Sequence, residues 1–332
     1  MTPAPLLLEV RDFRLSLPID GQQRPILRGV DLVVDRREAV ALVGESGGGK
    51  SMLARAMLGL VPPRAQVAGD IRADGASVYA MSREDLRRYR ATRVAMIFQD
   101  PTAHVNPVRQ IGDFLTEALR TNQHVRGGEA RRRVTVLLEE VGVPHAARRL
   151  RQYPHELSGG LLQRVMIAGA LAAEPELLIA DEPTTALDVT TQAEVMAILQ
   201  DLRAERGLAL LFVTHDLELA AAVCDRTAVM YAGEIVEEQS SEALHTAPRH
   251  PYTAALLDAR PSVERSSHRL RTVAGRPVAA YEADAGCGFA PRCGHAQAVC
   301  AAHPPVTHIG SARVRCVRAE ELEGRVAGDR SH

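Results

Sequence analysis

The sequence has 332 residues, of which 46% are hydrophobic and 24% are charged, enough for a buried core in one or two domains. The net charge is −1, tryptophan is absent, and aromatic residues make up 3%. Such a chain has no overall basic field and few rings for base stacking, so we expect no nucleic-acid partner. The longest apolar runs, such as Leu208–Val213, are far shorter than the ~20 residues that span a bilayer. Met1–Val10 has neither a basic start nor a cleavable apolar stretch, so no signal peptide is expected.

The basic residues are almost all of one type. Of the 40, 39 are Arg and one is Lys, at position 50. A GC-rich genome favours Arg codons over Lys codons wherever a positive charge is enough. The single Lys could then have been retained by chance. Alternatively, position 50 needs an ammonium where a guanidinium fails, because the two ions differ in shape, hydration and donor geometry.

The first part of the chain alternates between strand and helix patterns. Leu6–Leu17 and Gly29–Val34 are predicted strands near a turn at Asp20–Gly21. Val40–Val43 is a short apolar run typical of a buried strand, and Met52–Leu60 has a helical pattern. A glycine-rich stretch separates these two elements.

A helical region follows. Glu84–Arg93 is a predicted charged helix, and Val94–Phe98 is a predicted buried strand. From 101 to about 165, helical patterns and Arg clusters dominate, broken at Gly127–Gly128 and Pro144. This change of character predicts a helical subdomain inserted into an α/β core.

The chain then returns to the α/β pattern. Leu177–Ala180 and Leu210–Val213 are predicted buried strands, separated by a predicted helix at Thr191–Glu205. Strands that alternate with helices favour a mostly parallel sheet covered on both faces. After about Pro248 the chain becomes rich in Pro, Gly, His and Cys, which indicates a boundary. The predicted division is an α/β core at 1–100 and 166–248, a helical subdomain at 101–165 and a C-terminal extension at 249–332.

Gly44–Ser51, with the sequence GESGGGKS, fits the P-loop pattern between a strand and a helix. The glycines let successive backbone N–H groups point at phosphate oxygens, and the following helix adds its positive N-terminal end. Lys50 would reach the β- and γ-phosphates of a nucleotide, and the Ser51 hydroxyl would ligate Mg²⁺. A chance glycine-rich turn is the alternative, and the flanking strand and helix argue against it. The candidate nucleotide contacts here are Gly44, Ser46, Gly47, Gly48, Gly49, Lys50, Ser51 and Met52.

Two carboxylates end the predicted strand at Leu177–Ala180. Asp181 can hold Mg²⁺ directly or through water, and Glu182 is placed to polarise an attacking water as a general base. Acidic pairs after strands are common, so the pair alone is a weak signal. Together with the P-loop it indicates nucleotide hydrolysis.

Leu157–Arg164, with the sequence LSGGLLQR, resembles the signature motif of ATP-binding cassette (ABC) ATPases, and its Ser158 lies 23 positions before Asp181. The other motifs of that family follow in order. Gln99 at a strand end resembles the Q-loop glutamine, Thr185–Asp188 resembles the D-loop, and His215 resembles the switch histidine. Because these motifs occur together and in order, they identify the chain as similar to an ABC cassette.

The resemblance covers about residues 5–260 and implies a RecA-like ATP-binding core. It implies that Ser158, Gly159 and Gly160, at the start of a helix, bind the γ-phosphate of ATP held by a second cassette, with Asp188 nearby. Two cassettes would close head to tail over two nucleotides. The catalytic residues that the resemblance implies are Lys50, Gln99, Glu182 and His215, and the implied Mg²⁺ ligands are Ser51, Gln99 and Asp181.

Two positions depart from the common pattern of the family. Leu161 stands where many cassettes have Gln, although an apolar residue there fits the oligopeptide branch, which often has Met. Leu17 stands at the position for adenine stacking, where an aromatic residue is usual. A leucine packs on the ring but lacks the stacking energy of ~0.5–1.5 kcal/mol, so we expect modest ATP affinity and weak selectivity for the base.

Four further stretches of the chain are Phe98–Pro101 with Asn106–Pro107, Tyr153–Glu156, Ala180–Asp188 and His250–Thr253. They resemble the peptide/nickel importer branch, and in particular the D-type ATPase subunit of oligopeptide and dipeptide importers. The resemblance implies a related F-type ATPase or a second copy as partner, two membrane permeases, an extracytoplasmic binding protein, and a place on the cytoplasmic side of the cell membrane. The Arg-rich segment Arg109–Arg151 would face the permeases or form a solvated surface.

Four cysteines gather in the C-terminal extension. D-type subunits have the same arrangement, and there the resemblance implies a [4Fe–4S] cluster with a structural role. Four thiolates suit such a cluster or a tetrahedral Zn²⁺. The spacing has no Cys-x2-Cys pair, which favours iron–sulfur, whereas His295, His303 and His308 keep a zinc site open, and unligated thiols are a third possibility. The cysteines are Cys287, Cys293, Cys300 and Cys316, while Cys224 falls in an apolar helical stretch and is expected in the core.

The sequence therefore predicts an ATP-hydrolysing subunit that energises peptide import. A nickel or other small-solute importer of the same branch is the first alternative. A soluble ABC ATPase of translation or DNA repair is a distant one, because the chain has one cassette and only 137 positions separate Gly44 from Asp181, too few for a long coiled coil. An iron–sulfur electron carrier is a third class, and the complete set of ATPase motifs argues against it.

Overall fold

The computed structural model describes residues 6–185, 187–259, 273–283 and 285–322. Ala186 of the D-loop-like motif lies outside the described residues. The chain divides into two compact units. The first unit comprises residues 1–33, 39–79 and 213–332, and the second comprises 34–38 and 80–212.

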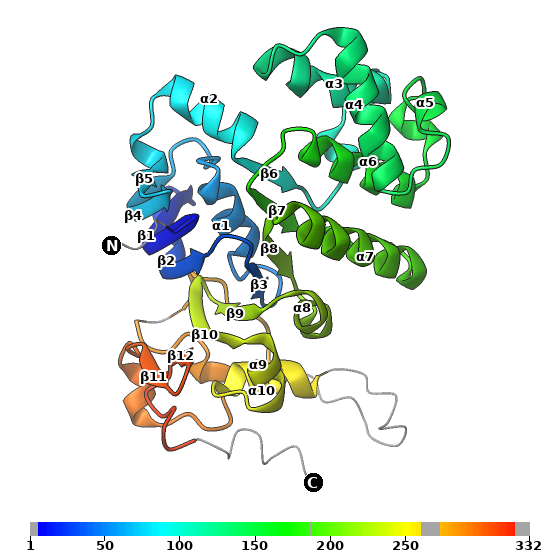
Figure 1. Ribbon diagram of the computed structural model, residues 1–332. Coiled ribbons are helices and arrows are strands. Elements are labelled where there is room, and N and C mark those ends of the chain that lie inside the picture. Colours follow the sequence, from blue (N-terminus) through cyan, green and yellow to red (C-terminus); the bar gives the residue numbers. More distant parts are fainter. Residues whose placement is uncertain (1–5, 186, 260–272, 284, 323–332) are drawn as a thin grey trace, which may run out of the picture. The chain divides into compact units, whose positions relative to one another are not determined.

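An antiparallel sheet begins the first unit, with strand order β2-β1-β4-β5 (Figure 1). The turn between β1 and β2 is at Asp20–Gly21, as the sequence predicts, and both residues have positive φ, 51° and 76°. Such a turn matches the twist of the strands that it joins. The bounds are β1 (Leu8–Ile19), β2 (Gln22–Val34), β4 (Gln66–Ala73) and β5 (Ala76–Ser77).

The first unit also contains strands in the order β11-β12-β10-β9-β3. Strand β3 pairs with β9 in parallel, and the pairs β9–β10, β10–β12 and β11–β12 are antiparallel. Helix α1 follows β3, and α9 and α10 follow β10. The bounds are β3 (Ala39–Val43), α1 (Lys50–Met57), α8 (Leu217–Val223), β9 (Arg226–Tyr231), β10 (Glu234–Ser240), α9 (Ser241–Thr246), α10 (Pro251–Asp258), β11 (Thr307–Ile309) and β12 (Ala312–Val314).

Strand β10 is buried although four of its seven residues have acidic or amide side chains. Each buried carboxylate has partners, and most of them come from later parts of the chain. Glu234 contacts His303, Glu237 accepts backbone N–H groups of Arg249 and His250, and Glu238 pairs with Arg226 and Arg313. Because a buried charge is costly unless it is paired, these contacts fix the C-terminal extension to β10.

The second unit combines three strands, in the order β8-β7-β6, with helices. Strands β6 and β7 are parallel, and every residue of β7 and β8 is buried, which is typical of strands covered on both faces. The last two residues of β8 belong to the first unit. The bounds are α2 (Arg83–Thr92), β6 (Val94–Ile97), β7 (Leu177–Asp181), α7 (Val189–Arg206) and β8 (Ala209–Thr214).

A group of helices forms the rest of the second unit, where the sequence predicts a helical subdomain (Figure 1). Helices α3, α4 and α6 pack on one another through their apolar faces. Along the described parts of the chain we find no helix that combines the length and the hydropathy needed to cross a membrane. The bounds are α3 (Ile111–Asn122), α4 (Gly127–Glu140), α5 (Ala146–Arg149) and α6 (Gly159–Leu171).

Candidate ATP-binding site

The P-loop connects β3 to α1 in the first unit, as the sequence predicts. All of β3 is buried, so the loop starts from a rigid strand. At Gly44 an added Cβ would lie 2.1 Å from the carbonyl oxygen of Met230, so the loop passes directly against β9 and excludes any side chain there. Gly49, just before α1, has φ of 103°, a backbone conformation that disfavours other residues.

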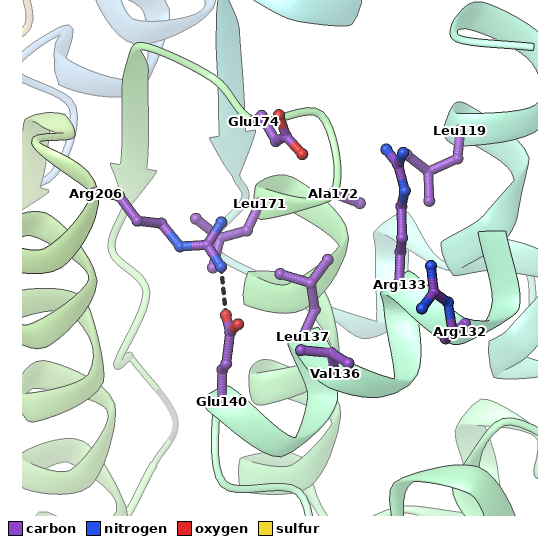
Figure 2. A pocket seen from close by; sticks show the side chains of 10 residues that line it. All are labelled: Leu119, Arg132, Arg133, Val136, Leu137, Glu140, Leu171, Ala172, Glu174 and Arg206. Atoms are coloured by element: carbon purple, nitrogen blue, oxygen red, sulfur yellow. Dashed lines mark hydrogen bonds and ion pairs between the residues drawn. The ribbon is translucent and has the colours of Figure 1, made fainter. Parts of the chain in front are cut away.

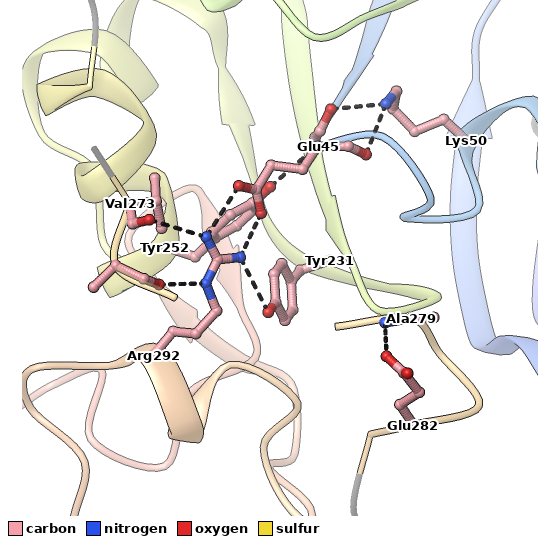
Figure 3. Close-up of polar contacts among 10 residues, drawn as sticks. Glu45, Lys50, Tyr231, Tyr252, Val273, Ala279, Glu282 and Arg292 are labelled. Carbon is pink, nitrogen blue, oxygen red and sulfur yellow. Dashed lines mark hydrogen bonds and ion pairs between the residues drawn. The ribbon is translucent and has the colours of Figure 1, made fainter. Parts of the chain in front are cut away.

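The Lys50 ammonium lies inside the loop. Its side chain is buried, with 5% of the residue exposed. Nζ donates hydrogen bonds to the carbonyl oxygens of Gly44 and Glu45, at 2.7 and 3.0 Å (Figure 3). The ammonium is thus held by backbone atoms of the same loop that would bind phosphates. Among the other predicted contacts, Ser51 and Met52 are half-buried, and Ser46 and Gly47 are exposed.

Glu45 has two partners that the sequence analysis missed. Its backbone N–H donates to the hydroxyl oxygen of Tyr252 at 2.9 Å. Both of its carboxylate oxygens accept from the Arg292 guanidinium, at 2.6 and 3.0 Å (Figure 3). Tyr252 lies in a stretch that resembles the importer branch, but no local pattern connects Arg292, 247 positions away, with the P-loop.

Arg292 is almost fully buried, with 3% of its side chain exposed. Besides Glu45, it donates to the Tyr231 hydroxyl at 3.3 Å, and its guanidinium lies 5.7 Å from the centre of the Tyr231 ring. Burial alone would lower the pKa of Arg292, but the hydrogen bonds to Glu45 and Tyr231 outweigh it and raise the pKa above its usual value. The guanidinium is therefore a fixed positive charge beside the P-loop.

In the second unit the two predicted carboxylates end β7. Asp181 is buried, with 1% exposed, and Glu182 follows with φ of 46°. The Glu182 Oε2 atom accepts hydrogen bonds from Gln99 Nε2 at 3.1 Å and from Thr185 Oγ1 at 2.8 Å. The structure thus brings together Glu182 and Gln99, which are 83 positions apart, and orients the carboxylate of the predicted base.

The predicted second phosphate site is also in the second unit, where α6 and α7 begin next to each other. Ser158 caps α6, its hydroxyl accepting the Leu161 N–H at 3.4 Å, and Gly159 is the first helical residue. Asp188 caps α7 by accepting from the N–H and the hydroxyl of Thr191, and these bonds lower the pKa of Asp188. At Gly160 an added Cβ would lie 2.5 Å from Thr191, so a larger residue would force the helix starts apart.

The remaining predicted nucleotide contacts lie in the first unit. His215 is exposed, directly after β8, and precedes Asp216, which caps α8. Leu17 is half-buried on β1. The P-loop, His215 and Leu17 thus belong to one unit, and the carboxylates, Gln99 and the signature-like motif belong to the other.

The four clustered cysteines line one small cavity in the first unit, together with His250, His295 and Phe289. Burial raises the pKa of the thiols of Cys287, Cys293 and Cys316, the last to about 11. In the parts of the chain that the structure describes, no three or more His, Cys, Asp or Glu side chains are arranged to hold a metal ion. The iron–sulfur cluster therefore stays a prediction. Cys224 is buried next to the end of α8, as expected.

A second cavity lies among the helices of the second unit (Figure 2). Its wall combines apolar side chains of α3, α4 and α6 with charged groups, and Arg206 forms an ion pair with Glu140 across it. The lining residues are Leu119, Arg132, Arg133, Val136, Leu137, Glu140, Leu171, Ala172, Glu174 and Arg206.

Comparison with known proteins agrees with this geometry. Residues 27–185 match the ABC transporter family, and residues 236–300 match the family "Oligopeptide/dipeptide transporter, C-terminal region". The oligopeptide transport ATP-binding protein OppD of Escherichia coli (strain K12) is 38% identical over 321 residues, which are 96% of this chain and 95% of OppD. A peptide import ATP-binding protein of Brucella abortus (strain 2308) is 42% identical over 312 residues, 93% of this chain and 94% of that one.

The chain belongs to the ATP-binding subunits of oligopeptide/dipeptide ABC transporters. It is thus an ABC transporter ATPase, as its motifs predict. Its α/β fold is that of an ABC cassette. A dimeric ATP-binding cassette bound to ADP and Pi aligns with 70% of this chain and 98% of its own length, with a TM-score of 0.64 and 27% identity.

Proposed function

We propose that this subunit binds ATP at the P-loop and hydrolyses it with Glu182 as general base. The observation that carries the proposal is the buried Lys50 ammonium within a loop of backbone groups at the start of α1. Lys50 would bind the β- and γ-phosphates, and His215 would contact the γ-phosphate. Glu182, oriented by Gln99 and Thr185, would take a proton from the attacking water.

Mg²⁺ would neutralise charge on the phosphates of bound ATP. The residues that would hold it fit this role, because hydroxyl, amide and carboxylate oxygens are the donors that Mg²⁺ prefers. Asp181 offers a buried carboxylate at a strand end. The proposed ligands are Ser51, Gln99 and Asp181.

ATP binding would also join two cassettes. We propose that Ser158, Gly159, Gly160 and Asp188 approach the γ-phosphate of ATP held by a partner cassette, either an F-type subunit or a second copy. The exposed, capped start of α6 supports this role, because helix N-termini attract phosphate. The dimeric form of the similar cassette bound to ADP and Pi supports such a pairing.

ATP hydrolysis would drive the import of peptides across the cytoplasmic membrane. The names of the E. coli and B. abortus relatives support this substrate class. The subunit would lie on the cytoplasmic face with two permeases and an extracytoplasmic binding protein. Nickel and other small solutes, which importers of the same branch would carry, are the alternative substrates.

We test the cargo with the purified complex in liposomes that contain ATP, adding the binding protein loaded with one solute at a time. Peptide-loaded binding protein should stimulate ATP hydrolysis above the level of the empty binding protein. Stimulation by a nickel chelate, with none by any di- or oligopeptide, would contradict the peptide proposal.

The Arg-rich segment Arg109–Arg151 of the helical region would face the permeases. The cavity between α3, α4 and α6 supports this part of the proposal, because it combines apolar surface with arginines on the wall (Figure 2). The RecA-like core would comprise 1–100 and 166–248, and the C-terminal extension 249–332.

We further propose that the four cysteines of the extension hold a structural [4Fe–4S] cluster. All four line a single cavity, which supports a common ligand. Since burial keeps several of these thiols protonated, ligand binding would release protons and stabilise a small region that has little core of its own. Anaerobically purified protein should be brown and contain about four irons per chain. Colourless protein loaded with zinc and free of iron would contradict the cluster.

A further inference from the structure

The C-terminal extension holds Glu45 of the P-loop from two directions. Tyr252, at the start of α10, accepts the backbone N–H of Glu45. Arg292 binds both oxygens of the Glu45 carboxylate (Figure 3). Both partners are buried, so water does not replace them easily. The main chain and the side chain of Glu45 are thus fixed by residues more than 200 positions later.

Glu45 in turn determines where the Lys50 ammonium lies. One of the two carbonyl oxygens that accept from Nζ belongs to Glu45, and the other belongs to the preceding Gly44. A shift of the Glu45 backbone would therefore move the acceptors of Lys50. A displacement of about 1 Å at a reacting group is enough to slow an enzyme about 10²-fold.

The turn that carries Arg292 is closed by backbone hydrogen bonds between near neighbours in the chain. Arg292 is the last residue of a 3₁₀ turn at Ala290–Arg292. The Ala290 N–H donates to the Cys287 carbonyl at 3.0 Å, and the Cys293 N–H donates to the Ala290 carbonyl at 3.2 Å. The turn lies between two cysteines of the cavity, and the Cys287 N–H joins this segment to the Cys300 carbonyl at 3.0 Å.

We propose that Arg292 is a positioning residue for the P-loop, which holds Glu45 so that Lys50 is oriented toward the phosphates of ATP. The inference rests on the proposed role of Lys50. It makes the C-terminal extension part of the nucleotide site. Loss of Arg292 would leave the Glu45 carboxylate without its buried partner and release the loop.

The test compares Arg292→Gln, Glu45→Gln and the double variant as full-length subunits in the assembled complex. We measure the Kd of a fluorescent ATP analogue, KM, kcat and thermal unfolding. Arg292→Gln should weaken ATP binding and raise KM about tenfold or more. The double variant should bind ATP no more weakly than the worse single variant, because both changes remove the same pair, Arg292 with Glu45. Arg292→Lys should restore part of the affinity.

Arg276→Gln is the matched control. Arg276 lies in the same extension and binds both oxygens of Glu282, at 2.8 and 3.1 Å, but its side chain is 73% exposed. This variant should keep the ATP affinity of the original chain.

An unchanged ATP affinity in Arg292→Gln would overturn the proposal, even if the variant unfolds at a lower temperature. If Arg292→Gln does not fold, the Glu45→Gln variant provides the test. An unchanged KM for ATP in Glu45→Gln would also overturn the proposal. A different result would show that the proposed ATP site is wrong. In that case the Lys50→Arg variant would retain ATP hydrolysis.

Discussion

At the scale of single residues, Lys50 explains the imbalance among the basic residues. Its ammonium lies within hydrogen-bond distance of two carbonyls of its own loop and is buried. A guanidinium is planar and larger, and its donors diverge in a fork, so it does not fit the same space. The single lysine stands where the backbone closes around the charge.

Lys50→Arg should therefore reduce ATP hydrolysis about 10²–10³-fold, the range seen when one donor to a developing charge is lost. The fold should persist, because the charge is kept. A phosphate-release assay gives the rate, and a thermal unfolding curve gives the stability. Wild-type turnover in a folded variant would show that position 50 tolerates either cation.

The Glu182→Gln variant should bind ATP but hydrolyse it very slowly. The amide cannot accept the proton of the attacking water, which is expected to cost about 10²–10⁴-fold in kcat. The substitution changes the shape very little. The variant should accumulate bound ATP and favour the closed pair of cassettes, which gel filtration with ATP detects. Normal hydrolysis would exclude Glu182 as the base.

Leu17 predicts weak selectivity for the base of the nucleotide. Leu17→Tyr should add stacking energy of about 0.5–1.5 kcal/mol and tighten ATP binding up to about tenfold. Competition titrations with ATP and GTP measure both effects. A strong preference of the unaltered chain for ATP over GTP would count against this position as the adenine contact.

At the scale of elements, the sequence predicts those elements that have a local pattern of apolar residues and glycines. The P-loop lies between β3 and α1 because a buried apolar run meets a glycine-rich stretch, and Asp20–Gly21 forms its turn because both residues accept positive φ. Strand β10 could not be predicted, because its sequence EIVEEQS is polar although the strand is buried. Its carboxylates are tolerated only through partners such as His303 and Arg313, which no local pattern reveals.

In the candidate site, too, residues with a local sequence pattern could be predicted and residues without one could not. The motifs located Lys50, Asp181 and Glu182, because strand ends and glycine loops carry local signals. Arg292 was missed, because its contact with Glu45 joins positions 247 apart. The motifs assign Glu182 and Gln99 separate roles, and their hydrogen bond appears only in the structure.

Gly44→Ala tests how closely the P-loop is packed on β9. The new Cβ would lie 2.1 Å from the Met230 carbonyl oxygen, so strand or loop must move. We expect a loss of about 1–3 kcal/mol in the free energy of unfolding, as in other overpacked sites, and weaker ATP binding. Gly128→Ala in α4 is the control, because an added Cβ there meets nothing within 4 Å. Equal stability of the two variants would contradict the close packing.

At the scale of the whole molecule, the chain is the ATPase subunit of a transporter, and its two compact units carry different parts of the machinery. The first contains the P-loop and the C-terminal extension, and the second contains the carboxylates and the signature-like motif. The proposed peptide import requires the partners that such a subunit energises. In this proposal, ATP hydrolysis with Glu182 as the base drives transport.

The most direct measurement is the ATP-dependent uptake of a labelled peptide into liposomes that contain the assembled transporter, with either the original subunit or Glu182→Gln. We expect uptake with the original subunit and ATP, and none above the ATP-free background with the variant, although the variant still binds ATP. Undiminished uptake with Glu182→Gln, or uptake without ATP, would contradict the account.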